Sequence, residues 1–590
     1  MSINQIQKQT NKNIQEKANL IWQIATHLVG LYKPHEYGKV ILPFTVLKRF
    51  DDALKPTKKD VLTAYNGFPA TMPESVKEGV LTQKSKYKFY NTSKFDFEKL
   101  IADPDGIEDN FEDYLKGFSA NVQDILANFK FADEVKTLAN GNVLFTVLQE
   151  FNSSKADMAP DKISSQDMGY IFEELVRKFS ESYDEQAGAH FTSRDIIYLM
   201  TELLVLPERD EIAKNGCTKT AYDMTMGTSQ MLGCLTEKLK DINESADLTC
   251  FGQEFNPETY AIAKSDMLIK GGNASGMMYG DTLSDDKFTG YEFDYIISNP
   301  PFGIDWKREE TAVKKENAKG DEGRFAAGLP KISDGQLLFM LNGIKKLKDG
   351  TGRMAIIQNG SSLFVGDSGS VAIRKYIIEN DLLEAIIQLP TDLFYNTGIA
   401  TYIWVISKGK EGTPREGKVQ LINASDCYIK RRKNIGSKRV DLDDACIELI
   451  LKAYNEFEKK EYEEGSLKVE SKVFEKEFFG YTTVTVETAE KDAKGNYIMK
   501  KGKRVAKKGA TDSEIVPLTE DIDEFFNKNV LPYNPDAFMD RTKDKIGYEI
   551  PFTRLFYKFV APKSSDEIFA EIKELEAEET SLMKELFGNE

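Results

Sequence analysis

Short β-rich runs alternate with helical stretches from about residue 161 onward, and this alternation constrains the fold more than any other feature of the chain. Strands that alternate with helices form a mostly parallel sheet with helices packed on both faces. We therefore predict a doubly wound α/β domain, preceded by a helical region in residues 1–160. The expected strands are 218–223, 248–252, 276–279, 293–298, 353–358, 383–389 and 402–406.

The first three expected strands each end in residues suited to a nucleotide-like ligand. The first ends at Asp223 and runs into the small-residue loop 224–230, where backbone amides and a helix N-terminus can approach a ligand. The next two end at Glu254 and Asp281, carboxylates suited to ribose hydroxyls and to an adenine amine. Each feature alone is weak evidence, because any α/β fold turns on Gly and Asp. Residues 227–232 depart from Gly-x-Gly-x-x-Gly at two positions, which argues against hydride transfer.

The tetrapeptide Asn299-Pro300-Pro301-Phe302, directly after the fourth expected strand, indicates a chemistry. Proline fixes φ and removes a backbone donor, so the turn is stiff and the Pro300 carbonyl has little local competition. The Asn299 side chain adds a second acceptor, and Phe302 offers a ring for stacking. Two acceptors aimed at one exocyclic amine would orient its lone pair toward an electrophile, as methylation of a base requires. The alternative is an ordinary strand-ending turn.

These segments, in this order, resemble the adenine-N6 DNA methyltransferases whose S-adenosylmethionine motif comes first. Other parts of the chain extend the resemblance to the modification subunits of type I restriction-modification systems, from end to end. These parts are Ile21-Trp22, residues 42–50, 188–194 (Gly-Ala-His-Phe-Thr-Ser-Arg), 396–401 (Asn-Thr-Gly-Ile-Ala-Thr), 433–439 and 547–552.

The resemblance implies a Rossmann-like S-adenosylmethionine-dependent methyltransferase sheet that methylates a flipped adenine in double-stranded DNA. Asn-Pro-Pro-aromatic turns also act on RNA and on protein glutamine, but the whole-chain resemblance favours DNA. The catalytic residues implied are Asn299, Pro300, Pro301 and Phe302. The residues implied for S-adenosylmethionine are Phe191, Thr192, Asp223, Gly227, Thr228, Ser229, Gln230, Glu254, Asp281 and Asn299.

The chain departs from the family pattern mainly in the cofactor loop. The family usually has proline at the positions of Met224 and Ser193, and glycine at the position of Ser229. If the Ser229 position needs a positive φ, its Cβ costs about 1 kcal/mol or more. The alternative function is therefore a catalytically weakened cofactor- or DNA-binding scaffold of the same kind of complex.

The net charge of −17 is unfavourable for binding DNA, because phosphate contacts need local cations. Basic residues concentrate in 430–439 and in 500–508. The first cluster is the better candidate for DNA or partner contact, and the second reads as a solvated hairpin. The resemblance implies a specificity subunit that reads the DNA, a restriction/translocase subunit, and two copies of this chain per specificity subunit.

Composition predicts a cytoplasmic protein without a metal site. No stretch reaches the roughly 18 consecutive apolar residues of a membrane span, and residues 1–5 have no apolar signal core. The five cysteines lack Cys-x-x-Cys spacing, and the three histidines show no metal-ligand spacing.

Pattern changes divide the chain into four expected regions. They are a helical domain (1–160), the methyltransferase domain (161–410), a charged region for DNA or partner contact (411–560) and a terminal assembly helix (561–590). Apolar residues from Ile568 to Leu586 follow four-three heptad spacing, which is typical of a helix that packs on a partner. The polar segment 303–331 is interpreted as a lid over the flipped base, with plain disorder as the alternative.

Overall fold

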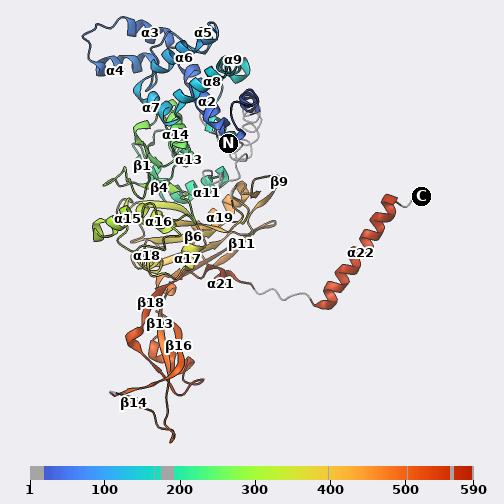
Figure 1. Cartoon of the computed structure of the whole chain (residues 1–590). Helices are drawn as coiled ribbons and strands as arrows, with labels where there is room; N and C mark the ends of the chain where they lie inside the picture. The colour runs from blue at the N-terminus through green and yellow to red at the C-terminus, as the bar shows by residue number, and fades with distance from the viewer. Residues whose placement is uncertain are drawn as a thin grey trace. The chain divides into compact units, whose positions relative to one another are not determined.

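The structure is a computed structural model that describes residues 19–164, 167–169, 171–172, 174–175, 192–395, 397–500, 502–558 and 564–587. Its N-terminal region is helical, drawn in blue in Figure 1. The helices are α2 (Tyr37–Leu54), α3 (Lys58–Asn66), α4 (Glu74–Ser85), α5 (Phe97–Ile101), α6 (Ile107–Lys116), α7 (Ala120–Asn128), α8 (Phe131–Asn140) and α9 (Leu144–Phe151).

Aromatic side chains hold these short helices together. The Phe44 ring of α2 stacks on Phe111 of α6 with ring centroids 5.8 Å apart, and on Phe151 of α9 at 5.5 Å. Phe131 of α8 meets Phe44 edge-on at 5.0 Å. All four rings are fully buried, so α2 forms the centre of the region's core.

One ten-stranded sheet forms the middle of the molecule. Its strand order is β11-β12-β8-β6-β7-β5-β4-β1-β2-β3. The strands are β1 (Thr218–Asp223), β2 (Asp247–Glu254), β3 (Met277–Tyr279), β4 (Tyr295–Ser298), β5 (Arg353–Asn359), β6 (Leu383–Gln388), β7 (Thr401–Ser407), β8 (Lys418–Asn423), β11 (Lys460–Glu464) and β12 (Leu467–Glu475).

The first seven strands confirm the doubly wound sheet predicted from the sequence. β3, β2, β1, β4 and β5 pair in parallel, and β7 inserts antiparallel between β5 and β6. The chain moves outward from β1 to β3 and in the opposite direction from β4 to β5, so right-handed crossovers cover opposite faces. The point of reversal, between β1 and β4, is where an open sheet of this kind leaves a crevice for a ligand.

The remaining helices of this region connect or cover the strands. They are α11 (Arg194–Val205), α12 (Arg209–Ile212), α13 (Gln230–Ile242), α14 (Pro257–Ile269), α15 (Glu310–Asn317), α16 (Gln336–Lys345), α17 (Ser361–Phe364), α18 (Ser368–Glu379) and α19 (Asp444–Glu456). α14 also joins the sheet to the N-terminal helices. Its Lys264 forms an ion pair of 2.7 Å with Asp124 of α7, and Tyr260 donates to the same carboxylate at 3.1 Å.

The sheet continues past residue 410, where the sequence suggested the end of the domain. β8 pairs in parallel with β6, and β12 pairs antiparallel with β8, so residues 418–475 widen the same sheet. Both outer strands are poor templates for further pairing, because β3 has three residues and β11 carries exposed charges. The sequence did not predict β8, β11 and β12, because polar or charged residues interrupt all three and none has a continuous apolar run.

Two further parts lie outside the large sheet and before the C-terminal unit in the sequence. β9 (Ile429–Ile435) and β10 (Lys438–Asp441) form a hairpin, and a separate arm, drawn in orange in Figure 1, holds a four-stranded sheet. The arm comprises β13 (Gly480–Ala489), β14 (Met499–Lys500), β15 (Lys503–Arg504), β16 (Ala506–Pro517), α20 (Ile522–Asn529), β17 (Ala537–Met539) and β18 (Lys545–Tyr548).

The C-terminal residues, Pro551–Glu590, form a unit of their own. It contains α21 (Phe552–Phe556) and the long helix α22 (Ser565–Phe587). Within the described ranges, no helix is long and apolar enough to cross a bilayer.

Candidate active site

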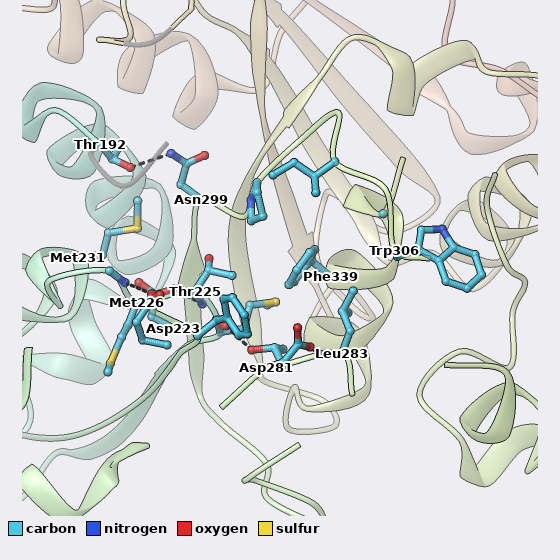
Figure 2. A pocket seen from close by; sticks show the side chains of 18 of the residues that line it. Thr192, Asp223, Thr225, Met226, Met231, Asp281, Leu283, Asn299, Trp306 and Phe339 are labelled. Atoms are coloured by element: carbon cyan, nitrogen blue, oxygen red, sulfur yellow. Dashed lines mark hydrogen bonds between the residues drawn. The ribbon is translucent and has the colours of Figure 1, made fainter. Parts of the chain in front are cut away.

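A cavity of about 450 Å3 opens at the carboxyl ends of the central strands, at the predicted crevice (Figure 2). Of the residues predicted from the sequence, it is lined by Thr192, Asp223, Gly227, Thr228, Gln230, Glu254, Asp281, Asn299 and Pro301. Pro300, Phe302 and Ser229 are described but lie off its wall, and Phe191 lies outside the described residues.

The loop between β1 and α13 forms one side of the cavity. Gly227 has a φ of +52°, which glycine adopts without a steric cost. Its amide donates to Oε2 of Glu254 over 2.9 Å, which ties the loop to the end of β2. Ser229 also has a positive φ, +67°, and its side chain does not cap α13. Ser229 therefore adopts a left-handed backbone conformation, which is strained for a residue that carries a Cβ.

Asp223 is a buried carboxyl at the end of β1. Its Oδ1 accepts from the Ser298 hydroxyl over 2.7 Å and from the Thr225 amide over 3.1 Å. Burial raises the pKa of Asp223 to about 7, against the lowering effect of these two donors, and the nearby Glu254 charge raises it further. The group therefore titrates near neutral pH.

Glu254 and Asp281 present carboxylates from the next two strand ends. Both Glu254 oxygens already accept backbone amides, one from Gly227 and one from Asn256 at 2.7 Å, which fixes the carboxylate plane. Oδ1 of Asp281 accepts from the amides of Leu283 and Ser284 at 2.7 and 2.9 Å. A carboxylate oxygen has two lone pairs, so acceptor sites remain toward the cavity.

Asn299 follows β4 and stands across the cavity from the carboxylates. Its Nδ2 donates to Oγ1 of Thr192 over 2.8 Å, shown as a dashed line in Figure 2. Its Oδ1 is buried, and no described residue donates to it. A buried acceptor without a donor costs about 1–3 kcal/mol, so this atom is set up for an incoming N–H. The assignment of oxygen and nitrogen follows from the Thr192 contact.

The prolines and Phe302 shape the turn in different ways. Pro300 is buried, and its carbonyl accepts no hydrogen bond from the described residues. Pro301 lines the cavity, whereas Phe302 is half-buried and packs against the hydrophobic core. Only part of the Phe302 ring is therefore available for stacking.

The segment after the turn supplies cavity residues that the sequence did not point to individually. They are Ile304, Asp305, Trp306, Arg308, Glu309, Gly335 and Phe339. The Arg308 guanidinium lies 4.8 Å from the centre of the ring of Phe255, the residue that follows β2. Burial raises the pKa of Glu309, and the Asp281 charge raises it further. The tryptophan within a polar segment was the one sequence signal that could have indicated this wall.

Arg324 anchors this segment to the loop that carries Asp281. Its guanidinium donates to the carbonyls of Thr282 and Leu283 at 2.6 and 3.0 Å, and to Oδ1 of Asn342 at 3.1 Å. Residues 303–331 are thus packed against the loop that carries Asp281, and they include α15. The alternative of plain disorder is wrong, and the role of a lid stays a prediction.

The first basic cluster is divided between the surface and the core. Lys438 is buried, and its Nζ bonds to Asp195 at 3.0 Å and to the Leu393 carbonyl at 2.9 Å. Arg431 pairs with Asp441. Lys430, Arg432 and Arg439 remain exposed, so the cluster offers fewer cations to a partner than its sequence suggests. Among the residues that the structure describes, no group of three or more His, Cys, Asp or Glu is arranged to hold a metal ion.

Comparison with known proteins agrees with this geometry. The family described as the HsdM N-terminal domain matches residues 17–151. The type I restriction enzyme MjaIX methylase subunit of Methanocaldococcus jannaschii is 30% identical over 293 residues, 49% of this chain and 48% of that protein. The HindI methylase subunit of Haemophilus influenzae is 30% identical over 218 residues, 36% of this chain and 46% of that protein. The chain thus spans about half the length of the curated relatives it matches.

A solved structure shares the fold. The type I restriction-modification methyltransferase subunit from Streptococcus thermophilus aligns with a TM-score of 0.62 and 22% identity, over 79% of this chain and 97% of that chain. The family described as N-6 DNA Methylase matches residues 163–493, more than half of the chain and the whole of the cavity. The protein therefore belongs to the N-6 DNA Methylase family.

Proposed function

We propose that this protein methylates the N6 amine of adenine in double-stranded DNA, as the modification subunit of a type I restriction-modification complex. The observation that carries the proposal is the buried Oδ1 of Asn299, an acceptor without a donor at the cavity wall. An exocyclic amine is the group that would satisfy it.

S-adenosylmethionine fits the other half of the cavity and, when bound, supplies a methyl group on a positively charged sulfur. Glu254 and Asp281 would accept from the ribose hydroxyls and the adenine amine, and Asp223 would accept from the charged amino group of the cofactor. The volume of about 450 Å3 suits a nucleoside with a short side chain.

The turn would align the target amine rather than deprotonate it. Asn299 Oδ1 and the Pro300 carbonyl would each accept one amine hydrogen, which directs the nitrogen lone pair into the cavity. The nitrogen gains the methyl group and then loses one proton to water, because neither oxygen is a strong base. The adenine has to leave the duplex first, at a cost of a few kcal/mol that Phe302 would offset only in part.

The assembly also belongs to the proposal. The matched relatives are methylase subunits of type I restriction enzymes, so we expect a specificity subunit and a restriction/translocase subunit as partners. The apolar residues of α22, which include Ile568, Ile572 and Leu575, are about half exposed or more, as expected of a helix that binds another chain.

Replacement of Asn299 by alanine tests the chemistry. We expect methylation of a cognate duplex to fall by about 100-fold or more, because one aligned acceptor is lost. S-adenosylmethionine affinity, measured by calorimetry, should stay within a few-fold. Thr192→Val is the matched variant: it keeps Oδ1 but removes the bond that fixes it, so an intermediate rate is expected. Wild-type methylation by Asn299→Ala would sink the mechanism.

A cofactor- or DNA-binding scaffold is the second candidate, and the left-handed backbone at Ser229 favours it. Strain in the cofactor loop would lower affinity without changing the fold. No detectable S-adenosylmethionine binding, even with partner subunits and DNA present, would decide for the scaffold.

A further inference from the structure

The tip of the arm, residues 491–510, carries a concentration of positive charge that the catalytic site does not use. It holds eight lysine or arginine residues and one acid, Asp492, on a chain whose net charge is −17. Lys501 lies outside the described residues and takes no part in the argument. We call residues 491–510 the arm tip.

The arm tip is built on a two-stranded ribbon and not on a loose loop. β14 pairs antiparallel with β15, and the Val505 amide donates to the Ile498 carbonyl over 2.9 Å. The Glu490 amide then donates to the Val505 carbonyl over 2.8 Å, which joins the ribbon to the end of β13. Gly502 has a φ of +78°, as its tight turn requires. The cations are therefore held in a defined spacing.

Most of these cations have no acidic partner. Lys500, Lys503, Lys507 and Lys508 are exposed, and none forms an ion pair with any residue that the structure describes. The Arg504 guanidinium stacks on the Tyr497 ring at 4.3 Å from its centre. Lys491 differs, because it pairs with Asp536 at 2.6 Å. Two of these lysines lie on the ribbon and two at the start of β16, and an anionic partner would relieve the repulsion among these like charges.

The single acid at the arm tip is occupied by its own turn. Asp492 Oδ1 accepts from the amides of Lys494 and Asn496 at 2.8 and 2.9 Å, and Oδ2 accepts from the Asn496 side chain at 3.4 Å. The Asn496 side chain is thereby bonded to Asp492 and is not available to contact a base. The other charged side chains of the arm tip are lysines and Arg504. Lysine acts as a point charge toward phosphate, and phosphate contacts carry no sequence information.

We propose that the arm tip binds the phosphate backbone of DNA, with the β14–β15 ribbon at the major groove and its lysines on the flanking phosphates. The major groove is wide enough for a two-stranded ribbon. The inference rests on DNA as the substrate of the proposed function, and it adds a sequence-independent contact for a chain that is otherwise acidic.

The test replaces Lys500, Lys503, Lys507 and Lys508 by glutamine in the full chain with its specificity subunit. Affinity for a duplex of random sequence is measured between about 50 and 200 mM salt. Because each phosphate contact contributes about 0.9 to the slope of log K against log salt, we expect the slope to flatten by up to about 3.6 and the affinity to fall at least tenfold at the lower salt concentration.

The matched control replaces Lys59, Lys84, Lys240 and Lys452, four exposed lysines spread over other elements, by glutamine. It changes the net charge equally and should leave the slope within one unit of the wild type. Equal losses in both variants, or an unchanged slope in the arm-tip variant, would overturn the proposal. The proposal would also be overturned if the arm-tip variant lost binding to anionic lipid vesicles or to an acidic peptide while its duplex binding stayed intact. A wild-type complex that never methylates would refute the proposed function but not the arm-tip contact, because the salt slope is read without turnover.

Discussion

Ser229 places a Cβ on a backbone with a φ of +67°, a conformation that costs an L-residue about 1–2 kcal/mol. The hydroxyl gives little in return, since it does not cap α13 and only meets the Met277 sulfur at 4.0 Å. Ser229→Gly should therefore tighten S-adenosylmethionine binding by up to about fivefold, the equivalent of about 1 kcal/mol. Calorimetry on the two proteins measures the difference.

Ser229→Ala is the control for that substitution. It removes the hydroxyl but keeps the Cβ, so we expect affinity equal to the wild type. Equal affinities for all three proteins would show that strain at this position does not limit binding.

We expect Asp223 to make the affinity for S-adenosylmethionine depend on pH. Its pKa is raised from 3.8 to about 7, so below pH 7 the folded protein holds a proton that the unfolded chain gives up above about pH 4. This group favours the folded state at low pH, and that contribution is lost as pH rises through 7. A cationic ligand prefers the ionised carboxylate, so its affinity should rise between pH 6 and 8 with release of a proton.

Calorimetry at pH 6.5 in buffers of different ionisation enthalpy measures that proton. Asp223→Asn cannot ionise, so its affinity should be weaker and should vary less with pH. Proton release of the same size from Asp223→Asn would assign the titration to another group.

At the residue scale, the sequence predicted that the strand-end carboxylates and Asn299 would lie together, and they line one cavity. The carboxyl ends of neighbouring parallel strands meet at one edge, so position along the chain was enough to bring Asp223, Glu254 and Asn299 to one cavity. It could not predict that Ser229 and Phe302 would not line the cavity, because side-chain direction depends on packing.

At the scale of elements, one buried arginine holds the segment after the catalytic turn. Arg324 also lies 3.8 Å from Asp286 and 3.5 Å from Glu316. Its replacement by alanine leaves the carbonyls of Thr282 and Leu283 without their donor, while Asp286 and Glu316 keep their lysine partners, so the free energy of unfolding should fall by about 3 kcal/mol. S-adenosylmethionine affinity should fall as well, since the loop of Asp281 loses its support. Urea denaturation and calorimetry measure the two effects.

Arg308→Ala is the matched control, because Arg308 is largely exposed and loses only its stacking on Phe255 and a 4.0 Å ion pair with Glu309. We expect its unfolding free energy to change by about 1 kcal/mol or less. If Arg324→Ala were as stable as Arg308→Ala, the segment would be held by other contacts.

The contrast between predicted and missed elements has a physical cause. Buried central strands such as β5 and β7 read as continuous apolar runs, so their ranges were predicted almost to the residue. The packing of residues 303–331 involves Arg324, whose side-chain hydrogen bonds reach acceptors 18 to 42 residues away in sequence. No local pattern encodes such a contact.

At the scale of the whole molecule, the exposed apolar residues of α22 predict a separable assembly element. Removal of residues 561–590 should leave S-adenosylmethionine binding in place and abolish association with the specificity subunit. Ile572→Glu with Leu575→Glu should act similarly, because burial of two unpartnered carboxylates costs several kcal/mol. Co-purification and methylation of cognate sites measure the outcome.

Glu574→Ala with Glu578→Ala is the control on the same helix, at exposed polar positions, and should bind normally. A truncated chain that still co-purifies with its partner would show that α22 serves another purpose.

The outermost strand β11 has a consequence for the protein in a crowded solution. Four of its five residues are charged and exposed, and the opposite outer strand, β3, is only three residues long. A free strand of this kind gives another chain no uncharged template, so it opposes aggregation through edge-to-edge β-pairing. We therefore expect the protein to resist aggregation through the two edges of its large sheet at high concentration, even when no partner covers those edges.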